Sequence, residues 1–110
     1  MQLGALVFPS NAASGGVTQL VGNGSQSDIF TFAAAVRPQV QNQTTSFVYV
    51  AWGIGPARAA TQGDYLLGSA ASLPQPLSDS LATWISLYGP AGTHVNGTVA
   101  NSLWIAGVRQ

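Results

Sequence analysis

The sequence predicts an all-β protein: a single antiparallel β-sandwich, jelly-roll-like, of about seven to nine short strands. Its apolar residues come in short runs, separated by Gly, Pro, Asn and Ser, which favour turns. Several of these runs alternate between two faces, as half-buried strands do. The length of 110 residues suits one domain. We therefore expect residues 1–110 to form one sandwich around a modest core, without disulfides, because the chain has no cysteine.

The first apolar run, Leu3–Phe8, is closed by Pro9-Ser10-Asn11 and has two interpretations. It is either the first strand of the sandwich or part of an extended arm, residues 1–16, that becomes ordered on binding. On the second interpretation its apolar side chains contact a partner; these candidate interface residues are Leu3, Leu6, Val7 and Phe8. We then expect deletion of residues 1–11 to weaken attachment more than it weakens the fold.

The next two apolar runs differ in how clearly they predict a secondary structure. Val17–Val21 is closed by the turn-forming stretch 22–25. Ile29–Val36 fits either a helix or a strand: Ser27-Asp28 and three successive alanines favour a helix that ends before Pro38. Its aromatic and β-branched residues favour a strand, which we prefer. The polar stretch 41–45 is expected to be a loop between strands.

Ser46–Trp52 is the clearest strand, and both of its faces are apolar. Phe47, Tyr49 and Ala51 alternate with Val48, Val50 and Trp52. A strand with this composition is buried on both sides. In a sandwich one side faces the core, so the other must meet a loop, an arm or another subunit.

The remaining runs complete the predicted sandwich. Tyr65–Leu67 is a short run, and Leu73–Leu77, with two prolines, suits an edge or an extended crossover. Ala82–Tyr88 and Ser102–Val108 alternate, with Ile85, Leu87, Leu103 and Ile105 on one side, and are expected to be central together with Ser46–Trp52. Between them, Asn96-Gly97 is a dipeptide typical of hairpins.

The charge of the chain is unusually low. Only 5% of its residues are charged and the formal net charge is zero, whereas ordinary domains are about a quarter charged. A neutral, weakly charged surface favours association. We therefore expect much of the surface to be covered by copies of the chain or by another protein. We expect no nucleic-acid partner, which would need Lys and Arg, and no membrane span, which would need a longer apolar run.

The residue types that carry chemistry are scarce. There is one histidine, three aspartates, and neither glutamate nor cysteine. His94 is interpreted as a turn residue, and its spacing to Ser78-Asp79-Ser80 is too generic to indicate a catalytic triad. The aspartates are too far apart to indicate a metal site. We expect no catalytic, cofactor-binding or metal-binding residues and no cofactor.

Two other patterns can be interpreted either as functional or as without functional meaning. Asn42-Gln43-Thr44 and Asn96-Gly97-Thr98 fit the N-glycosylation pattern, which we treat as chance matches. Four aromatic residues could form a platform that stacks on sugars, although aromatic residues in strands are more often core or interface; they are Trp52, Trp84, Tyr88 and Trp104.

The order of the motifs in residues 36–108 resembles the small β-sandwich virion proteins of tailed bacteriophages, which include head decoration (cement) and head-fibre-base proteins. The matching segments are Phe47–Gly53, Ala60-Thr61, Asp64–Ser69, Trp84–Gly89 and Ser102–Gly107. Each motif is loose, so their order carries the resemblance. Residues 1–30 have no counterpart in the family, which leaves the mode of attachment open.

The resemblance implies a non-enzymatic capsid decoration protein, made in the host cytoplasm and located on the capsid exterior. It implies two partners, the major capsid protein and further copies of the chain, as a homotrimer. Two other functions remain open: another virion position, in the tail, at the head–tail junction or at a fibre attachment, and a module that binds host glycans.

Overall fold

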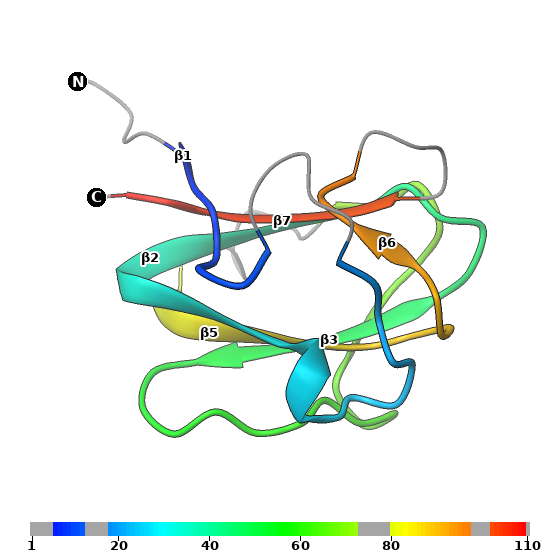
Figure 1. Ribbon diagram of the computed structural model, residues 1–110, viewed down its shortest axis with the longest axis horizontal. Helices are drawn as coiled ribbons and strands as arrows, with labels where there is room; N and C mark the ends of the chain where they lie inside the picture. Colours follow the sequence, from blue (N-terminus) through cyan, green and yellow to red (C-terminus); the bar gives the residue numbers. More distant parts are fainter. Residues whose placement is uncertain (1–5, 13–17, 73–79, 98–101, 110) are drawn as a thin grey trace.

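The computed structural model describes residues 6–12, 18–72, 80–97 and 102–109. Within them lie seven strands and one short 3-10 helix (Figure 1). These elements are β1 (Leu6–Val7), η1 (Gln26–Asp28), β2 (Ile29–Asn42), β3 (Val48–Gly53), β4 (Tyr65–Leu67), β5 (Ala82–Tyr88), β6 (His94–Val95) and β7 (Ser102–Val108). The prediction of an all-β, sandwich-like fold is confirmed. The described residues include no helix of the length and apolarity needed to cross a membrane.

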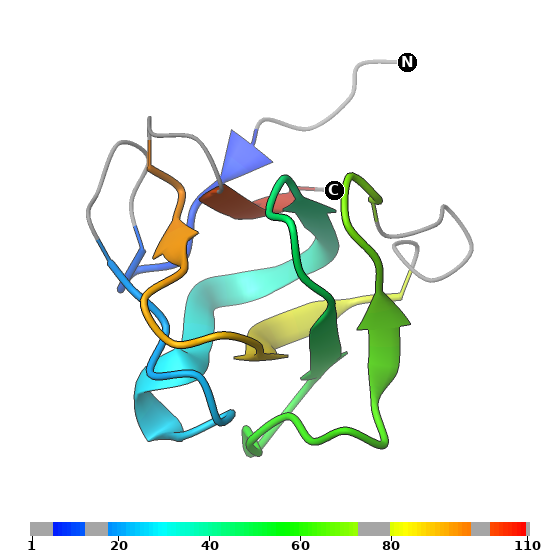
Figure 2. The same cartoon turned by 90° about the vertical axis from the view of Figure 1, so that its right-hand side faces the viewer.

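The strands form one sheet that folds back on itself. Its order is β1-β7-β2-β5-β3-β4, with β6 also paired to β7. Every pairing is antiparallel except that of β6 with β7. We call β1, β6, β7 and residues 37–42 of β2 the β7 layer. Residues 29–36 of β2 with β5, β3 and β4 form the β5 layer, which faces it (Figure 2).

Strand β2 links the two layers, which confirms the strand prediction for Ile29–Val36. Its first part pairs with β5 and its second part with β7. The register with β5 shifts between Thr31 and Val36, and the three exposed alanines 33–35 lie in that shift. The extra residues let the strand bend from one layer to the other, as bulges do.

Two boundaries of β2 correct the sequence-based prediction. The strand runs through Pro38, and Gln41 and Asn42 belong to it rather than to a loop. Asn42 donates its backbone N–H to Ala71 and Gln43 donates to Ser102 in the other direction. Since backbone donors alternate sides along a strand, the position of Pro38 is one whose N–H would point away from β7. Its missing donor therefore costs the β2–β7 ladder nothing.

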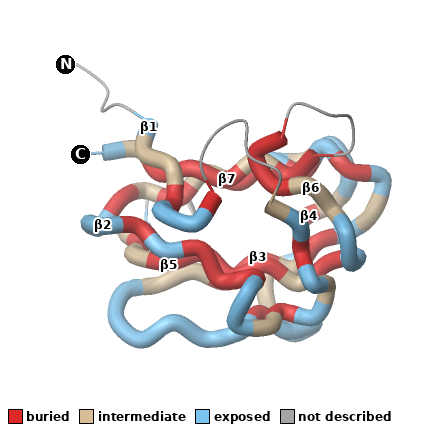
Figure 3. Tube along the Cα trace, in the orientation of Figure 1, coloured by how far each residue is buried: buried red, intermediate tan, exposed pale blue. Residues whose placement is uncertain are grey.

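The main core lies between the layers (Figure 3). The predicted alternation of β5 and β7 is confirmed, because Ile85, Leu87, Leu103 and Ile105 all point into it. The other strands supply Phe30, Val36, Val40, Val48, Val50 and Leu67. Gly107 also faces this region, and a side chain there would collide with Val36, so the two layers approach closely at the bend of β2.

A second, smaller cluster covers part of the outer face of the β5 layer. Ile29, Ala51 and Trp84 pack there against Ala60 from the loop that follows β3. The backbone N–H of Ala60 donates to the Ser86 hydroxyl at 2.7 Å. The second face of β3 thus meets a loop, which is one of the three alternatives expected from the sequence: a loop, an arm or another subunit. The strand begins at Val48 rather than Ser46, and Phe47 just before it is 64% exposed.

The regions around residues 20 and 95 also differ from expectation. Within the described part of Val17–Val21 no strand forms, and Gln19 makes only an isolated bridge to His94. His94 lies in β6, not in a turn. Asn96-Gly97 does not close a hairpin, because β6 runs parallel to β7. The predicted crossover Leu73–Leu77 lies outside the described residues.

Candidate interaction surface

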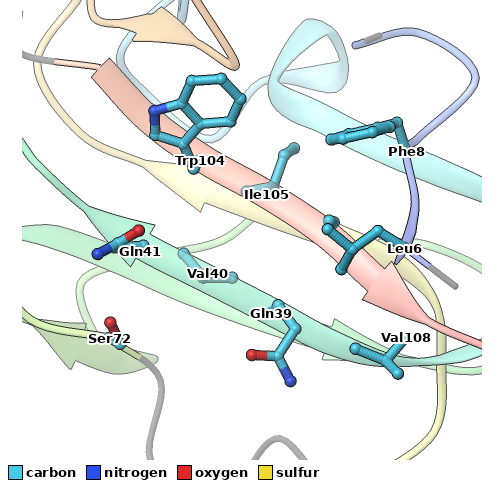
Figure 4. Close-up of a pocket in the computed structure, with 10 residues that line it drawn as sticks. Leu6, Phe8, Gln39, Val40, Gln41, Ser72, Trp104, Ile105 and Val108 are labelled. Atoms are coloured by element: carbon cyan, nitrogen blue, oxygen red, sulfur yellow. The ribbon is translucent and has the colours of Figure 1, made fainter. Parts of the chain in front are cut away.

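An open groove of about 420 Å³ crosses the outer face of the β7 layer (Figure 4). Trp104 and Phe8 stand on the β7 and β1 side, and Gln39, Gln41 and Ser72 on the β2 side. The remaining lining residues are Leu6, Val40, Ile105, Ala106 and Val108. None of these ten residues is charged, so the groove presents an apolar floor with neutral amide and hydroxyl groups along one side.

The strand register explains why this face is hollow. Trp104 and Val108 flank Ala106 along β7, since residues two apart in a strand share a face. Gln39 lies opposite Ala106 across the β2–β7 ladder. Val7 pairs with Gly107, which places Phe8 beside Ala106 on the remaining side. A methyl group surrounded by four larger side chains leaves a depression at this point of the groove.

The candidate interface residues fall into three groups. Leu6, which is 60% exposed, and Phe8 line the groove. Val7 points the other way and packs against the main core. Leu3 lies outside the described residues. Residues 6–12 are held by the fold: Ser10 donates its backbone N–H to Thr31, and the Asn11 amide donates to Ile29. Within that range the strand interpretation describes the structure.

Sequence reasoning missed the rest of the groove. The alternation of Trp104 and Ala106 with Leu103 and Ile105 was visible in the sequence, but not that the side of β7 with Trp104 faces outward. Gln39 and Gln41 gave no signal, because the strand was expected to end before them. Only the pairing of β2 with β7 brings these residues together.

The aromatic residues proposed as a sugar platform do not share one face. Trp104 lines the groove. Trp52 lies edge-on to Tyr65, with ring centroids 6.4 Å apart, and packs against the main core. Trp84 is 5% exposed and belongs, with Tyr88, to the small cluster on the opposite outer face. Only Trp104 therefore remains available for stacking in the groove.

The titratable groups are dispersed. The described residues contain no group of three or more His, Asp or Glu side chains that could hold a metal ion. The Nε2 of His94 lies 3.2 Å from the Gln19 amide nitrogen. The buried carboxylate of Asp28 accepts the backbone N–H groups of Val21 and Gly22. Of the residues considered with His94 as a catalytic triad, Ser78 and Asp79 lie outside the described residues.

One ion pair lies in the loop between β3 and β4. The Arg58 guanidinium donates to both carboxylate oxygens of Asp64, at 2.6 and 3.0 Å. Thr61 donates its backbone N–H to the same carboxylate. These hydrogen bonds, that of Arg58 first, lower the pKa of Asp64, and the Asp64 carboxylate raises the pKa of Arg58. The pair closes the loop.

The two glycosylation patterns noted in the sequence lie on buried asparagines. Asn42 and Asn96 are fully buried, and their amides are engaged in hydrogen bonds to the backbone. In the folded protein neither side chain is accessible to modification.

Comparison with protein-family models, curated proteins and solved structures finds no match to this chain.

Proposed function

We propose that this chain is a structural protein of a bacteriophage virion, most specifically a decoration protein that binds the major capsid protein and stabilises the head. The observation that carries the proposal is the uncharged groove around Ala106, on a chain of which only 5% of the residues are charged. Aromatic and apolar side chains around a depression are the usual centre of a protein–protein interface. The order of motifs in residues 36–108 supplies the virion context.

The stabilisation would be mechanical. An apolar side chain of the capsid protein seats over Ala106, between Phe8 and Trp104, while the amides of Gln39 and Gln41 bind backbone groups beside it. Full burial of one such side chain contributes about 2 kcal/mol. Repeated over many copies, this contact reinforces the seams between capsid subunits. Further copies of the chain, as a homotrimer, would join neighbouring contacts into one layer.

The first test is location. Virions produced by the source of the chain are purified and fractionated, and antibody to the chain is applied with gold labelling in electron microscopy. We expect label over the head. Absence of the chain from purified particles overturns the proposal, and label confined to the tail or to fibre attachment points replaces it with another virion position.

The second test is rebinding to particles depleted of the chain. Ala106→Trp places a large side chain in the depression, on the side of β7 that faces away from the main core, so we expect at least about tenfold weaker binding. Ala57→Trp, in the exposed loop after β3, is the matched control and should bind as the wild type does. Equal binding of both variants would place the contact elsewhere.

A second function is favoured by one observation: Trp104 stands beside the neutral hydrogen-bonding groups of Gln41 and Ser72. An aromatic face next to such groups suits a neutral sugar. Titration of neutral oligosaccharides, followed by tryptophan fluorescence, tests this function. It requires a saturable signal that Trp104→Ala abolishes; no change in emission would remove it.

A further inference from the structure

The outer face of the β5 layer is covered over only part of its area. At one end the loop after β3 packs on Ile29, Ala51 and Trp84. At the other end Phe47 is 64% exposed and Leu66 is 48% exposed. Beside them Tyr49 and Tyr88 are half-buried, and Tyr88 also packs against the small cluster. We call these four residues the aromatic patch.

The strand register makes the aromatic patch continuous. Tyr49 lies opposite Tyr88 on β5 and opposite Leu66 on β4, so the three side chains form a row across three strands. The two tyrosine rings meet edge to face, with centroids 5.9 Å apart. Phe47 extends the patch by one row and lies over Gly68, which leaves its ring open to solvent.

No described charged residue belongs to the aromatic patch. The nearest charges in sequence, Arg58 and Asp64, are paired with each other. Two copies of a chain with zero net charge approach each other at such a surface without net repulsion.

We propose that the aromatic patch is the surface at which a second copy of this chain binds. The covered end of the same face shows what the face accepts, since an uncharged loop segment with Ala60 at its centre is buried there. A second copy supplies the same uncharged chemistry, and most soluble oligomers are assemblies of identical chains. Large exposed apolar patches are uncommon on proteins that remain monomeric.

The aromatic patch and the groove lie on opposite outer faces of the sandwich. The core-facing residues of β5 and β7 meet between them, so both surfaces can be occupied at once. The self-association proposal therefore does not depend on the capsid assignment. The two can fail separately.

Sedimentation equilibrium over about 5 to 500 µM protein tests the proposal, since mass action reveals association as concentration rises. We expect the wild type to associate, and Phe47→Gln and Leu66→Gln each to weaken association by about tenfold or more. Both side chains are exposed, so the melting temperature should stay close to the wild-type value. Ile54→Gln, which replaces an exposed side chain of the same size as Leu66, and Val21→Gln, which replaces a smaller one, lie outside the aromatic patch; both are controls and should associate normally.

A wild type that stays monomeric across this range overturns the proposal. The proposal is also overturned if the Phe47 and Leu66 variants associate as strongly as the wild type. It is likewise overturned if the control variants lose as much association as they do. Because the chain has no cysteine, Leu66→Cys also provides a clean cross-linking site. Bis-maleimide should link Leu66→Cys copies far more efficiently than Val21→Cys copies, and equal linking counts against the aromatic patch. Loss of capsid binding with association intact would reject the decoration function alone.

Discussion

Two buried asparagines connect segments that are distant in sequence. The Asn96 amide accepts a hydrogen bond from the Ile105 N–H at 2.7 Å and donates to the carbonyls of Ile105 and Ala12, each at 2.9 Å. One side chain thus pairs with the edge of β7 between β6 and β1, where none of the described strands does. Asn42 plays a similar part, donating to the carbonyls of Ser46, Leu67 and Gly68.

Replacement of Asn96 should destabilise the protein strongly. Asn96→Ala leaves three buried backbone groups without a partner, and we expect a loss of about 3 kcal/mol in the free energy of unfolding. Asn96 has φ of 54°, a conformation that alanine tolerates poorly and glycine well. Asn96→Gly should therefore be less damaging than Asn96→Ala. Urea unfolding measures both; a loss below about 0.5 kcal/mol for either variant would contradict this role for the amide.

At the scale of elements, the loop between β3 and β4 determines how much of the β5 layer is covered. Its end is fixed by the Arg58–Asp64 pair and by the Thr61 N–H that donates to Asp64. Its middle is fixed by Ala60, which is bonded to Ser86. Side chains and hydrogen bonds in one loop thus decide which half of the face is buried and which half remains as the aromatic patch.

The contribution of this loop should depend on pH in one direction. The pKa of Asp64 is lowered in the folded state, so its carboxylate stabilises the fold above the ordinary aspartate pKa of about 3.9. That stabilisation is lost as the pH falls through the folded-state pKa. Because Arg58 is 57% exposed, we expect Asp64→Asn to cost only about 1 kcal/mol at pH 7.

The test is urea unfolding of the wild type and Asp64→Asn across the acid range. The difference between them should be constant above about pH 5 and shrink as the pH falls below the ordinary aspartate pKa. A difference that grows on acidification would show that the carboxylate does not stabilise the loop.

The first described segment is a second element whose role the structure revises. Within residues 6–12, strand β1 pairs with β7, the next residues bond to Thr31 and Ile29, and Ala12 lies in the core. Deletion of residues 1–11 should therefore lower the melting temperature by several degrees or more, as loss of about 1 kcal/mol does in a domain of this size. Deletion of residues 1–5 alone leaves these bonds intact. If it lowers the melting temperature equally, the bonds of residues 6–12 are not the cause.

The whole molecule combines few charges with two apolar outer surfaces. The groove lies on the outer face of the β7 layer and the aromatic patch on the outer face of the β5 layer. A protein built in this way can join a scaffold on one side to further copies of itself on the other. Its associations should draw on apolar burial rather than on ion pairs.

The response to salt tests this view. Raising NaCl from about 0.1 to 1 M shortens the screening length from about 10 to 3 Å, which weakens associations that rest on charge. We expect the self-association constant to change by less than about twofold. Sodium sulfate should strengthen association, because it favours the burial of apolar surface. Sedimentation in both salts measures this; loss of association in 1 M NaCl would indicate an ionic interface.

The sequence by itself determined the fold class, the strands at 82–88 and 102–108 with the alternation of their side chains, and, to within two residues at its start, the strand at 48–53. Period-two alternation and turn-forming residues are local signals, and they can be read along the chain. It also determined the low charge, from which association was inferred.

Only the tertiary structure decided the rest, because it depends on pairing between distant segments. The passage of β2 through Pro38 relies on β7, which lies over 60 residues further along the chain. The groove exists because that pairing places Gln39 opposite Ala106, and Phe8 reaches it through β1. Asn96 reads as a turn residue in sequence, yet its amide is buried against Ile105. A local pattern cannot reveal which partner an amide or a strand edge will meet.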